Sequence, residues 1–487
     1  LSGGLDQVFG SGVNGVNVNN TTFNGLPGGS AIHLVNTTGT ITLDANSISN
    51  SGNSGILLSN AGTVSITGGT IDNTSLHGIE SINTDLTVDG VTFGSALGLA
   101  GAGVSITNND ATNRTVNLTN LVSSATSNIG LQGIVINSSG VGTLTANLTG
   151  NSLAATQAGL LVNETAGVAA TDTVRLNLTG TNTWQSGTGV YAVDMNGQNV
   201  DADNSSVVIT SLGNGTITGN GTGGGVHFNN VGFDSDLGTV GNQQVAAGTW
   251  NIGQGILAGQ RVAGDGLRFD GPTGDVGFST LNIYNNNGTG LYVDTKSVGT
   301  TFNLGTGTGT IDTTNGAAMF LDPLTTAMTL TSVTSTNAIG DAVTFDTVGG
   351  AIAVGSLNIS GASGSGLLIG NSSGLTSTFT TVDISNVGTL VEDNGITLSD
   401  AGTVNVLGGT INGTTGNAIL SQDSNLTATG LNIGATGTIS GDGIGVGNTG
   451  TGSSYAVNIS NNTIKSTGLA ITSFDSGSAA DVSKADA

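Results

Sequence analysis

The sequence predicts an all-β fold, a right-handed parallel β-helix of about 17 three-strand coils that forms a single solenoid. The first reason is composition: 36% of the residues are apolar, only 4% are aromatic, and there are 84 Gly but 3 Pro. The apolar residues are almost all Val, Ile, Leu and Ala, and they alternate with Gly, Asn, Ser and Thr, which favours short strands and tight turns. Disorder is the competing interpretation, but the frequent β-branched residues and the low content of Pro and charge argue against it.

The second reason is a long-range repeat. Residues 55–94 align with residues 395–434 without a gap, and both copies contain AGTV and GGTI. A fixed offset between two copies indicates that they share one architecture, as the stacked units of a solenoid do.

The third reason is a short unit in which a small residue, usually Gly, precedes an apolar–x–apolar triplet. Most units begin 23 to 30 residues apart. Alternation predicts that the outer residues of each triplet point inward and the middle residue points outward. The first apolar residues of the units are Ile32, Ile56, Ile79, Val104, Ile134, Leu160, Val190, Val226, Leu267, Leu291, Met319, Val343, Leu367, Ile396, Ile419, Ile444 and Leu469.

Each period is expected to contain three short strands divided by turns. In one period these strands lie at 56–58, at 64–66 and at Ile71 after GGT, and successive coils would stack about 4.8 Å apart. Gly and Asn are expected at the corners, because tight turns need positive φ. Leucine-rich repeats are the rival solenoid, but their L-x-x-L-x-L pattern is missing. The Asn residues of SISN, TIDN, NIYN and NISN are expected to form hydrogen-bonded ladders between coils: Asn50, Asn73, Asn285 and Asn461.

Three regions are expected along the chain. Residues 1–30 form an N-terminal lead-in or cap region, residues 31–475 form the β-helix with enlarged loops in about 190–266, and residues 476–487 form a polar C-terminal tail. The chain does not open on a signal peptide, and we expect it to be a processed or excised part of a longer protein.

The charge is strongly acidic. Seven Lys and Arg against 31 Asp and Glu give a formal charge of −24, which disfavours nucleic acid and anionic membrane surfaces as partners. No Cys is present, so disulfides and thiolate metal sites are excluded. No apolar run approaches the roughly 18 residues of a membrane helix, so membrane insertion by this segment is not expected.

These repeats resemble the passenger regions of bacterial autotransporters and related large bacterial surface β-helix proteins. Those regions are similarly Cys-free, acidic and rich in Gly, Asn, Ser and Thr, and the resemblance covers essentially the whole chain. It lies in composition and period rather than in a motif. The chain lacks a C-terminal membrane-barrel pattern and an NPNG-like signature of two-partner secreted adhesins, so neither secretion route is assigned. The resemblance implies export to an extracellular or cell-surface location.

One face of the predicted solenoid is a candidate surface for binding a ligand or a partner. Units beginning at Leu160, Val190 and Val226 are 30, 36 and 41 residues long, and extra residues in a solenoid must leave as loops. Aromatic and basic residues at outward positions beside these loops are suited to stacking on sugar rings or on a protein. Drift in loop length, or a loop that covers this face, is the alternative interpretation. The candidate residues of the face are Tyr191, His227, Arg268, Tyr292, Phe320 and Trp250, of which Trp250 is expected on one of the long loops.

Catalysis is not expected. A β-helix glycoside hydrolase needs paired carboxylates, and NTD at 83–85 has no companion Asp–Asp pair. A polysaccharide lyase would need an Arg or Lys base and a Ca²⁺ cluster, which leaves one conceivable constellation. It comprises Arg268, His227 and a loop aspartate, which is Asp194, Asp234 or Asp236.

No cofactor is expected apart from a weak Ca²⁺ possibility. The oxygens of VDADN and FDSD could hold Ca²⁺ through Asp201, Asp203, Asp234 and Asp236, but a solvated acidic surface is the favoured explanation of these carboxylates. The G-G-x-G-x-D nonapeptide of calcium-dependent rolls is missing.

The leading hypothesis is a non-enzymatic extracellular rod, an adhesin or a surface-fibre or stalk segment. Its expected partner is a glycan or protein surface of a host or neighbouring cell, with end-to-end self-association through unpaired strand edges as a further expectation. The alternative is a polysaccharide-binding or lyase-like polysaccharide-cleaving β-helix that uses the face at 190–320.

Overall fold

The predicted fold class is confirmed by a computed structural model of the protein. The chain is an all-β parallel β-solenoid of about 16 turns, where the sequence predicts about 17. The one helix among the described residues is the 3₁₀ turn η1 (Ala258–Gln260). The structure describes residues 6–26, 28–94, 97–123, 129–166, 173–185, 187, 189–201, 204–219, 223–239, 241, 243–295, 302–449 and 454–475.

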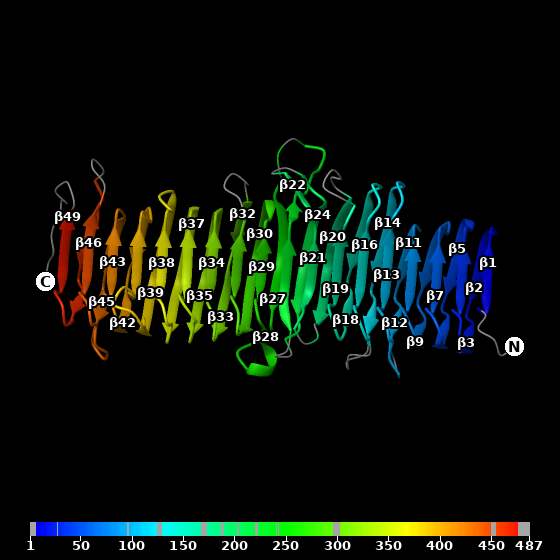
Figure 1. The fold of residues 1–487 in the computed structure, drawn as a ribbon, viewed down its shortest axis with the longest axis horizontal. Helices are drawn as coiled ribbons and strands as arrows, with labels where there is room; N and C mark the ends of the chain where they lie inside the picture. Colours follow the sequence, from blue (N-terminus) through cyan, green and yellow to red (C-terminus); the bar gives the residue numbers. More distant parts are fainter. Residues whose placement is uncertain are drawn as a thin grey trace. The chain divides into compact units, whose positions relative to one another are not determined.

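The chain divides into two compact units, which are described separately. Figure 1 labels strands of both units. Unit 1 comprises Leu1–Gln254 and Phe269–Val276, and unit 2 comprises Gly255–Arg268 and Gly277–Ala487. Two strands contribute residues to both units, namely β29 (Leu267–Asp270) and β30 (Thr273–Asn286).

Unit 1 contains three parallel ladders. The first comprises β1 (Val8–Ser11), β4 (Ile32–Val35), β7 (Ile56–Ser59), β10 (Ile79–Ile82), β13 (Val104–Asn108), β16 (Ile134–Ser138), β19 (Leu160–Glu164), β21 (Tyr191–Asn196) and β25 (Gly224–Asn229). The second comprises β2 (Asn14–Asn19), β5 (Thr38–Asp44), β8 (Thr63–Thr67), β11 (Leu86–Asp89), β14 (Arg114–Thr119) and β17 (Leu144–Thr149). The third comprises β3 (Thr22–Leu26), β6 (Ser47–Ser51), β9 (Thr70–Thr74), β12 (Thr92–Phe93), β15 (Val122–Ser123) and β18 (Ser152–Ala154).

Longer strands join the second and third ladders of unit 1 at its later coils. β20 (Val174–Gln185) pairs with β17 through its first half and with β18 through its second half. β24 (Val207–Ile217) follows, and it pairs with β26 (Val231–Phe233) and β27 (Val245–Ile252). A small antiparallel hairpin of β22 (Asn199–Asp201) and β23 (Asn204–Ser205) stands apart from the ladders.

Unit 2 repeats this arrangement. Its first ladder comprises β31 (Leu291–Asp294), β34 (Met319–Asp322), β36 (Val343–Asp346), β38 (Leu367–Gly370), β40 (Ile396–Ser399), β43 (Ile419–Gln422), β46 (Ile444–Asn448) and β49 (Ile471–Asp475). Its other strands are β28 (Val262–Ala263), β32 (Phe302–Thr306), β33 (Gly309–Thr314), β35 (Leu324–Thr336), β37 (Val348–Ser360), β39 (Leu375–Val387), β41 (Thr403–Val406), β42 (Gly409–Thr414), β44 (Asn425–Thr429), β45 (Leu431–Ile433), β47 (Val457–Ser460) and β48 (Thr463–Ile464).

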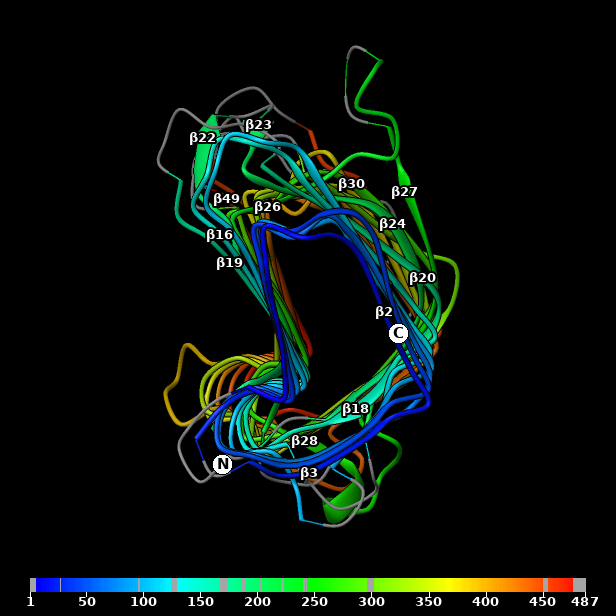
Figure 2. The ribbon, with the colours of Figure 1, turned by 90° about the vertical axis from the view of Figure 1, so that its right-hand side faces the viewer.

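The three ladders of unit 1 form three walls around one core. In Figure 2, β16 and β19 lie on one wall, β2, β20 and β24 on a second, and β3 and β18 on the third. Residues alternate between core and surface along each strand, as in β17, where Leu144, Ala146 and Leu148 are buried. Apolar residues therefore stack on apolar residues of the next coil, and Ile134 faces Leu160.

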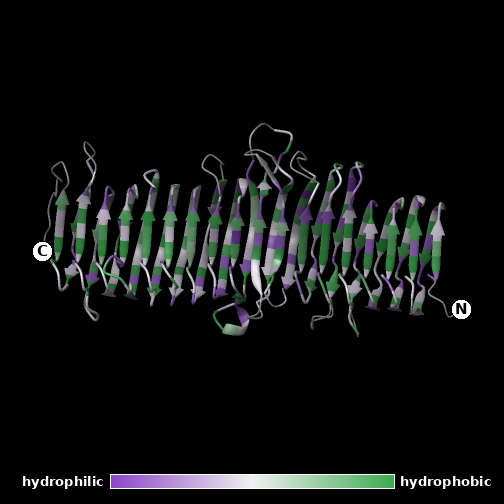
Figure 3. Cartoon of the chain, in the orientation of Figure 1, coloured by the Kyte–Doolittle hydropathy of each residue, from purple (hydrophilic) through white to green (hydrophobic). Residues whose placement is uncertain are grey.

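Aliphatic side chains fill most of the core, and hydrophobic residues mark the strands of both units in Figure 3. Unit 1 adds an aromatic cluster, in which Phe228 lies 5.4 Å from Phe233 and 5.2 Å from Phe269 between ring centroids. Full burial of each large apolar side chain contributes about 1.5–3 kcal/mol, so the core is the main source of stability.

All but two of the predicted unit starts occupy the predicted register. Val193, not Val190, pairs with Leu160 in β19, and Val190 is 36% exposed. At the other exception Ile471, not Leu469, pairs with Ile444, and Leu469 is 63% exposed. Both predictions were wrong for the same reason. In each case the loop before the strand contains a small residue followed by an apolar residue, which resembles the start of a unit.

The predicted region boundaries differ in outcome. The region expected as a lead-in or cap already forms a coil, because β1, β2 and β3 pair in register with β4, β5 and β6. The predicted tail at 476–487 lies outside the described residues.

The two copies of the long repeat fold alike. Residues 55–94 form β7 to β12 of unit 1, and residues 395–434 form β40 to β45 of unit 2 in the same order. The second glycine of GGTI has a positive φ in both copies, 92° at Gly69 and 115° at Gly409. A Cβ would lie 2.2 Å from the Asn46 carbonyl oxygen in the first copy and 2.0 Å from that of Val382 in the second, so only glycine fits.

Asparagine ladders between coils are confirmed for part of the predicted set. Asn50 donates 2.6 Å to Asn24 Oδ1, and Asn73 donates to Asn50 Oδ1. Asn285 instead lies buried and donates to the carbonyl oxygens of Gly264 and Gly288. Asn461 adopts a left-handed φ of 57°. Further ladders join Asn36, Asn60, Asn83 and Asn109, then Asn117, Asn147 and Asn177, and finally Asn137, Asn163, Asn196 and Asn229.

Candidate binding face

The outward column of the first ladder in unit 1 carries a histidine between two carboxylates. His227 Nδ1 lies 3.0 Å from Asp194 Oδ1, and His227 Nε2 lies 2.9 Å from Asp270 Oδ2. The Tyr191 ring packs on the imidazole at a centroid distance of 4.9 Å. A neutral imidazole has one donor nitrogen and can donate to only one of these carboxylates, whereas an imidazolium can donate to both. The His227 side chain is 16% exposed, so a ligand could reach it.

The same column in unit 2 carries a stack of three side chains. The Arg268 guanidinium carbon lies 4.0 Å from the centroid of the Tyr292 ring, and its Nη1 donates 2.9 Å to Asp265 Oδ2. Tyr292 and Phe320 occupy paired positions in β31 and β34, so their rings stack at 5.0 Å and 13°. Such cation–π and aromatic contacts contribute about 0.5–1.5 kcal/mol each.

This stacking changes what Tyr292 can offer a ligand. Arg268 covers one face of the ring and Phe320 covers the other. The expected stacking of a sugar on the flat face is therefore wrong for Tyr292, because the solenoid has already used both faces. What the ring presents to the outside is its edge and its hydroxyl, which donates 3.4 Å to Asp294 Oδ2.

A row of carboxylates runs beside the stack. Asp294 pairs with Asp322 in the register of β31 and β34, and the pairing of Leu321 with Phe345 places Asp346 beside Asp322. Partial burial of Asp322, together with the charges of Asp346 and Asp294, raises the pKa of its carboxyl. The carboxylates can accept hydrogen bonds from sugar hydroxyls or from basic side chains, and the ring edges beside them offer apolar contact.

Two predicted face residues lie elsewhere than expected. Tyr191 is not in the outward column of His227, because Asp194 pairs with His227 and Tyr191 pairs with Gly224. Trp250 is not on a loop: it lies in β27, is 1% exposed, and its Nε1 donates 2.9 Å to the Gly213 carbonyl oxygen. The indole of Trp250 fills the core at this position, so its side chain is not accessible to a partner.

The carboxylates proposed for Ca²⁺ serve local turns where the structure describes them. Asp234 Oδ1 accepts from the backbone of Asp236 and of Gln243, each at 3.0 Å. Asp236 accepts from the Thr239 hydroxyl at 2.6 Å and the Gly238 N–H, and these bonds lower the pKa of its carboxyl. The Asp201 side chain and Asp203 lie outside the described part of the chain. No group of three or more His, Cys, Asp or Glu among the described residues is placed to hold a metal ion.

The residues of the conceivable lyase belong to two units. Asp194 and His227 meet in unit 1, as described above. Asp234 and Asp236 lie together in a turn of the same unit. Arg268 belongs to unit 2, where Asp265 and Tyr292 engage its guanidinium.

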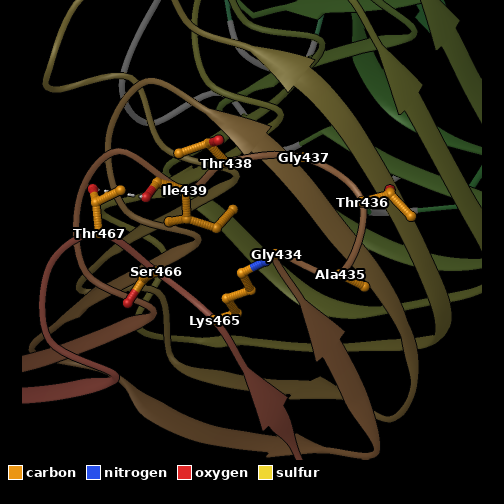
Figure 4. A pocket seen from close by; sticks show the side chains of 9 residues that line it. All are labelled: Gly434, Ala435, Thr436, Gly437, Thr438, Ile439, Lys465, Ser466 and Thr467. Carbon is orange, nitrogen blue, oxygen red and sulfur yellow. Dashed lines mark hydrogen bonds between the residues drawn. The ribbon is translucent and has the colours of Figure 1, made fainter.

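Unit 2 also has a surface pocket of about 290 Å³ at the corner after β45 (Figure 4). Thr467 closes one side, because its hydroxyl donates 3.0 Å to the Ile439 carbonyl oxygen. The lining offers hydroxyls, main-chain groups and one ammonium, which suits a small ligand rich in acceptors. The lining residues are Gly434, Ala435, Thr436, Gly437, Thr438, Ile439, Lys465, Ser466 and Thr467.

Sequence reasoning missed the row of carboxylates beside the aromatic stack of unit 2. It stopped at the triplet, whereas the strands LYVD, MFLD and VTFD continue for one more outward residue, Asp294, Asp322 or Asp346. Extending the alternation by two positions would have found all three. The same extension of LRFD would also have found Asp270, the last residue of β29. Asp265 precedes that strand and gave no such signal, because only the fold brings it to Arg268.

The fold defines the class of this protein, a parallel β-solenoid. No helix in the described part of the chain is long and apolar enough to cross a membrane. No family model matches the chain, and neither a curated protein nor a solved structure matches it.

Proposed function

We propose that this chain is a non-enzymatic β-helical segment of an exported bacterial surface protein and acts as an adhesin or a surface-fibre or stalk segment. The observation that carries the proposal is the set of side-chain ladders between coils. For example, side-chain amide hydrogen bonds link four coils through Asn137, Asn163, Asn196 and Asn229. Polar side chains used in this way stiffen the solenoid. The formal charge of −24 supports an extracellular role by keeping a long chain soluble.

The adhesive part of the proposal rests on the unit 2 stack of Arg268, Tyr292 and Phe320 with the carboxylates beside it. These groups are half-buried and therefore pre-ordered, which lowers the entropy cost of binding. The expected partner is a glycan or a protein surface with basic or hydroxyl donors.

Binding of the isolated chain to a glycan panel, to host-surface proteins and to itself tests the proposal. Binding to at least one of the three supports an adhesin, and it should fall at least tenfold in Tyr292→Ala or Phe320→Ala. Leu368→Ala is the matched control, since Leu368 is a half-buried outward residue of the same ladder. Failure in all three arms would remove the adhesive role and leave only a spacer.

A polysaccharide-binding or polysaccharide-cleaving protein is the second candidate. The contact of the Tyr292 hydroxyl with Asp294, beside the ion pair of Arg268 and Asp265, favours it because sugars need paired donors and acceptors. Release of unsaturated or reducing sugars that disappears in Arg268→Ala would support cleavage. If acidic and neutral polysaccharides both stay intact, with and without Ca²⁺, cleavage is excluded.

A further inference from the structure

A column of buried polar side chains crosses three coils of unit 1. Asn108, Ser138 and Glu164 are the last residues of β13, β16 and β19, and the register pairs Asn108 with Ser138 and Ser138 with Glu164. They share the inward parity of the apolar residues before them, such as Ile106, Ile136 and Val162. Their exposed fractions are 1%, 0% and 3%.

Each of the three side chains keeps one oxygen atom without a hydrogen-bond partner: Asn108 Oδ1, Ser138 Oγ and Glu164 Oε2. Their other groups are engaged. Asn108 Nδ2 donates 3.0 Å to the Gly142 carbonyl oxygen, and Glu164 Oε1 accepts from the Ala166 N–H at 2.5 Å. Three unpartnered oxygens in one buried column are unusual, because buried polar atoms nearly always have a partner.

The charge of Glu164 adds a free-energy cost to this column, because its carboxylate is buried. A buried carboxylate is costly unless a cation pairs with it. The ion pairs among the described residues do not include Glu164. The next coil supplies no side chain either, since Asn196 pairs with Asn163 and Gly197 follows it.

The spacing of the coils suits a metal ion. Adjacent coils stack about 4.8 Å apart, so an ion at the level of Ser138 lies about one coil step from the backbones of Asn108 and Glu164, and the longer side chains of those two residues can bridge that step. Hard cations such as Ca²⁺ bind carboxylate, amide and other oxygens at about 2.3–2.6 Å.

We propose that Glu164, Ser138 and Asn108 bind one hard cation inside unit 1. Glu164 supplies the negative charge, and Ser138 and Asn108 supply neutral oxygens. The ion links three successive coils and removes the cost of the buried carboxylate. Na⁺ and Ca²⁺ share this oxygen chemistry, and Na⁺ would balance the single charge of Glu164 completely. The donor set differs from the Asp-rich loops considered from the sequence.

Thermal unfolding of the whole chain in different salts tests the site. The chain is melted in tetramethylammonium chloride, whose bulky cation cannot enter, and then in NaCl, KCl or CaCl₂ at the same ionic strength. Binding to the folded state alone raises the midpoint with cation concentration. We expect at least one of the three coordinating cations to raise the midpoint by several degrees, and calorimetric titration to show one ion per chain.

Matched variants separate the site from general salt effects. Glu164→Gln keeps the shape and the acceptor for Ala166 but removes the charge, and it should abolish the cation-dependent shift. Ser138→Ala should weaken binding of the ion about tenfold while the chain stays folded. Glu392→Gln, which removes one exposed carboxylate, should keep the full shift.

Two results would overturn the proposal. One is an equal midpoint in all four salts, which would mean that internal water or a protonated Glu164 occupies the column. The other is the same cation-dependent shift in Glu164→Gln as in the unmodified chain, which would place the ion elsewhere.

Discussion

The Asn147 amide donates a 2.7 Å hydrogen bond to Asn117 Oδ1 on the preceding coil, and its own Oδ1 accepts a 2.7 Å bond from Asn177 on the next coil. Their backbones pair in strict register through β14, β17 and β20. The sequence repeat NLT thus becomes a continuous chain of amides, each oriented by its neighbours.

Asn147→Ala should break this ladder at its centre. Two part-buried hydrogen bonds are lost, and the expected cost is about 1–2 kcal/mol of unfolding free energy. Asn147→Asp should cost at least as much, because a carboxylate cannot donate to Asn117. Urea unfolding followed by circular dichroism measures both. Asn17→Ala, at an exposed outward position in β2, is the control and should change stability by less than about 0.5 kcal/mol. Equal effects at the two sites would mean that the ladder adds no stability.

Gly215→Ala should destabilise unit 1 through a clash with Trp250. These residues pair in register, and a Cβ on Gly215 would lie 2.5 Å from the indole ring. Overpacking of this kind costs about 1–3 kcal/mol. In a Trp184→Phe background, the emission of Trp250 should shift to the red as the ring loses its packing.

Gly349→Ala is the control for that substitution, because the nearest atom to its added Cβ is Thr325 Oγ1 at 3.9 Å. It should leave stability nearly unchanged. An unshifted emission in Gly215→Ala would show that the ring moves aside freely.

Arg261→Met should loosen the loop that contains η1 in unit 2. Arg261 is 5% exposed, and its guanidinium donates to the carbonyl oxygens of Ile256, Asn285 and Asp312 and to Asp312 Oδ1. Removing one partner of a buried pair costs about 3–5 kcal/mol, and we expect the lower end because Asp312 is partly exposed. Limited proteolysis should show new cleavage within 255–262.

Arg261→Lys separates charge from geometry in the same loop. Lysine keeps the positive charge but cannot make the planar fork to four acceptors, so cleavage should still increase. Protection equal to that of the unmodified chain would show that charge alone holds the loop.

Asp322→Asn should raise stability at neutral pH. The pKa of Asp322 is raised in the folded state, so between the unfolded and folded values the folded chain binds more protons and stability falls as pH rises. Above the folded pKa the carboxylate therefore destabilises the chain next to Asp294 and Asp346. Because Asp322 is only partly buried and solvent screens its charge, the gain should be only about a few tenths of a kcal/mol.

The pH dependence of that gain provides its check. Below the ordinary carboxyl pKa of about 3.9, Asp322 is protonated in both states and the advantage of asparagine should vanish. Midpoints measured at pH 7 and pH 3 decide the matter, with Asp236→Asn as a comparison of opposite sign. The pKa of Asp236 is lowered by hydrogen bonds, so its replacement should cost stability at pH 7. A gain for Asp322→Asn that persists at pH 3 would contradict the electrostatic explanation.

Much of the fold follows from local pattern. Alternation fixes which residues of a triplet point inward, and the fold confirms this at units such as those beginning at Ile134 and Leu160. GGTI recurs because Gly69 and Gly409 each sit where a Cβ would strike the preceding coil. These steric constraints recur along the solenoid, so each copy of the pattern supports the fold prediction independently.

The site was less predictable, because it depends on contacts between coils. The outward positions of His227, Arg268, Tyr292 and Phe320 follow from period two. That Phe320 and Arg268 would occupy both faces of Tyr292 does not, since stacking depends on register and rotamer. Trp250 looked like a loop residue because its period was long, and only the packed core shows it buried.

The sequence by itself determined the solenoid class, the strand positions and most inward columns, because these arise from steric rules that act within one coil. The tertiary structure alone decided which carboxylates face His227, which ring faces are covered, and that Glu164 ends a column of buried oxygens. Those relationships join residues 24 to 43 positions apart, and they exist only once neighbouring coils have stacked in register.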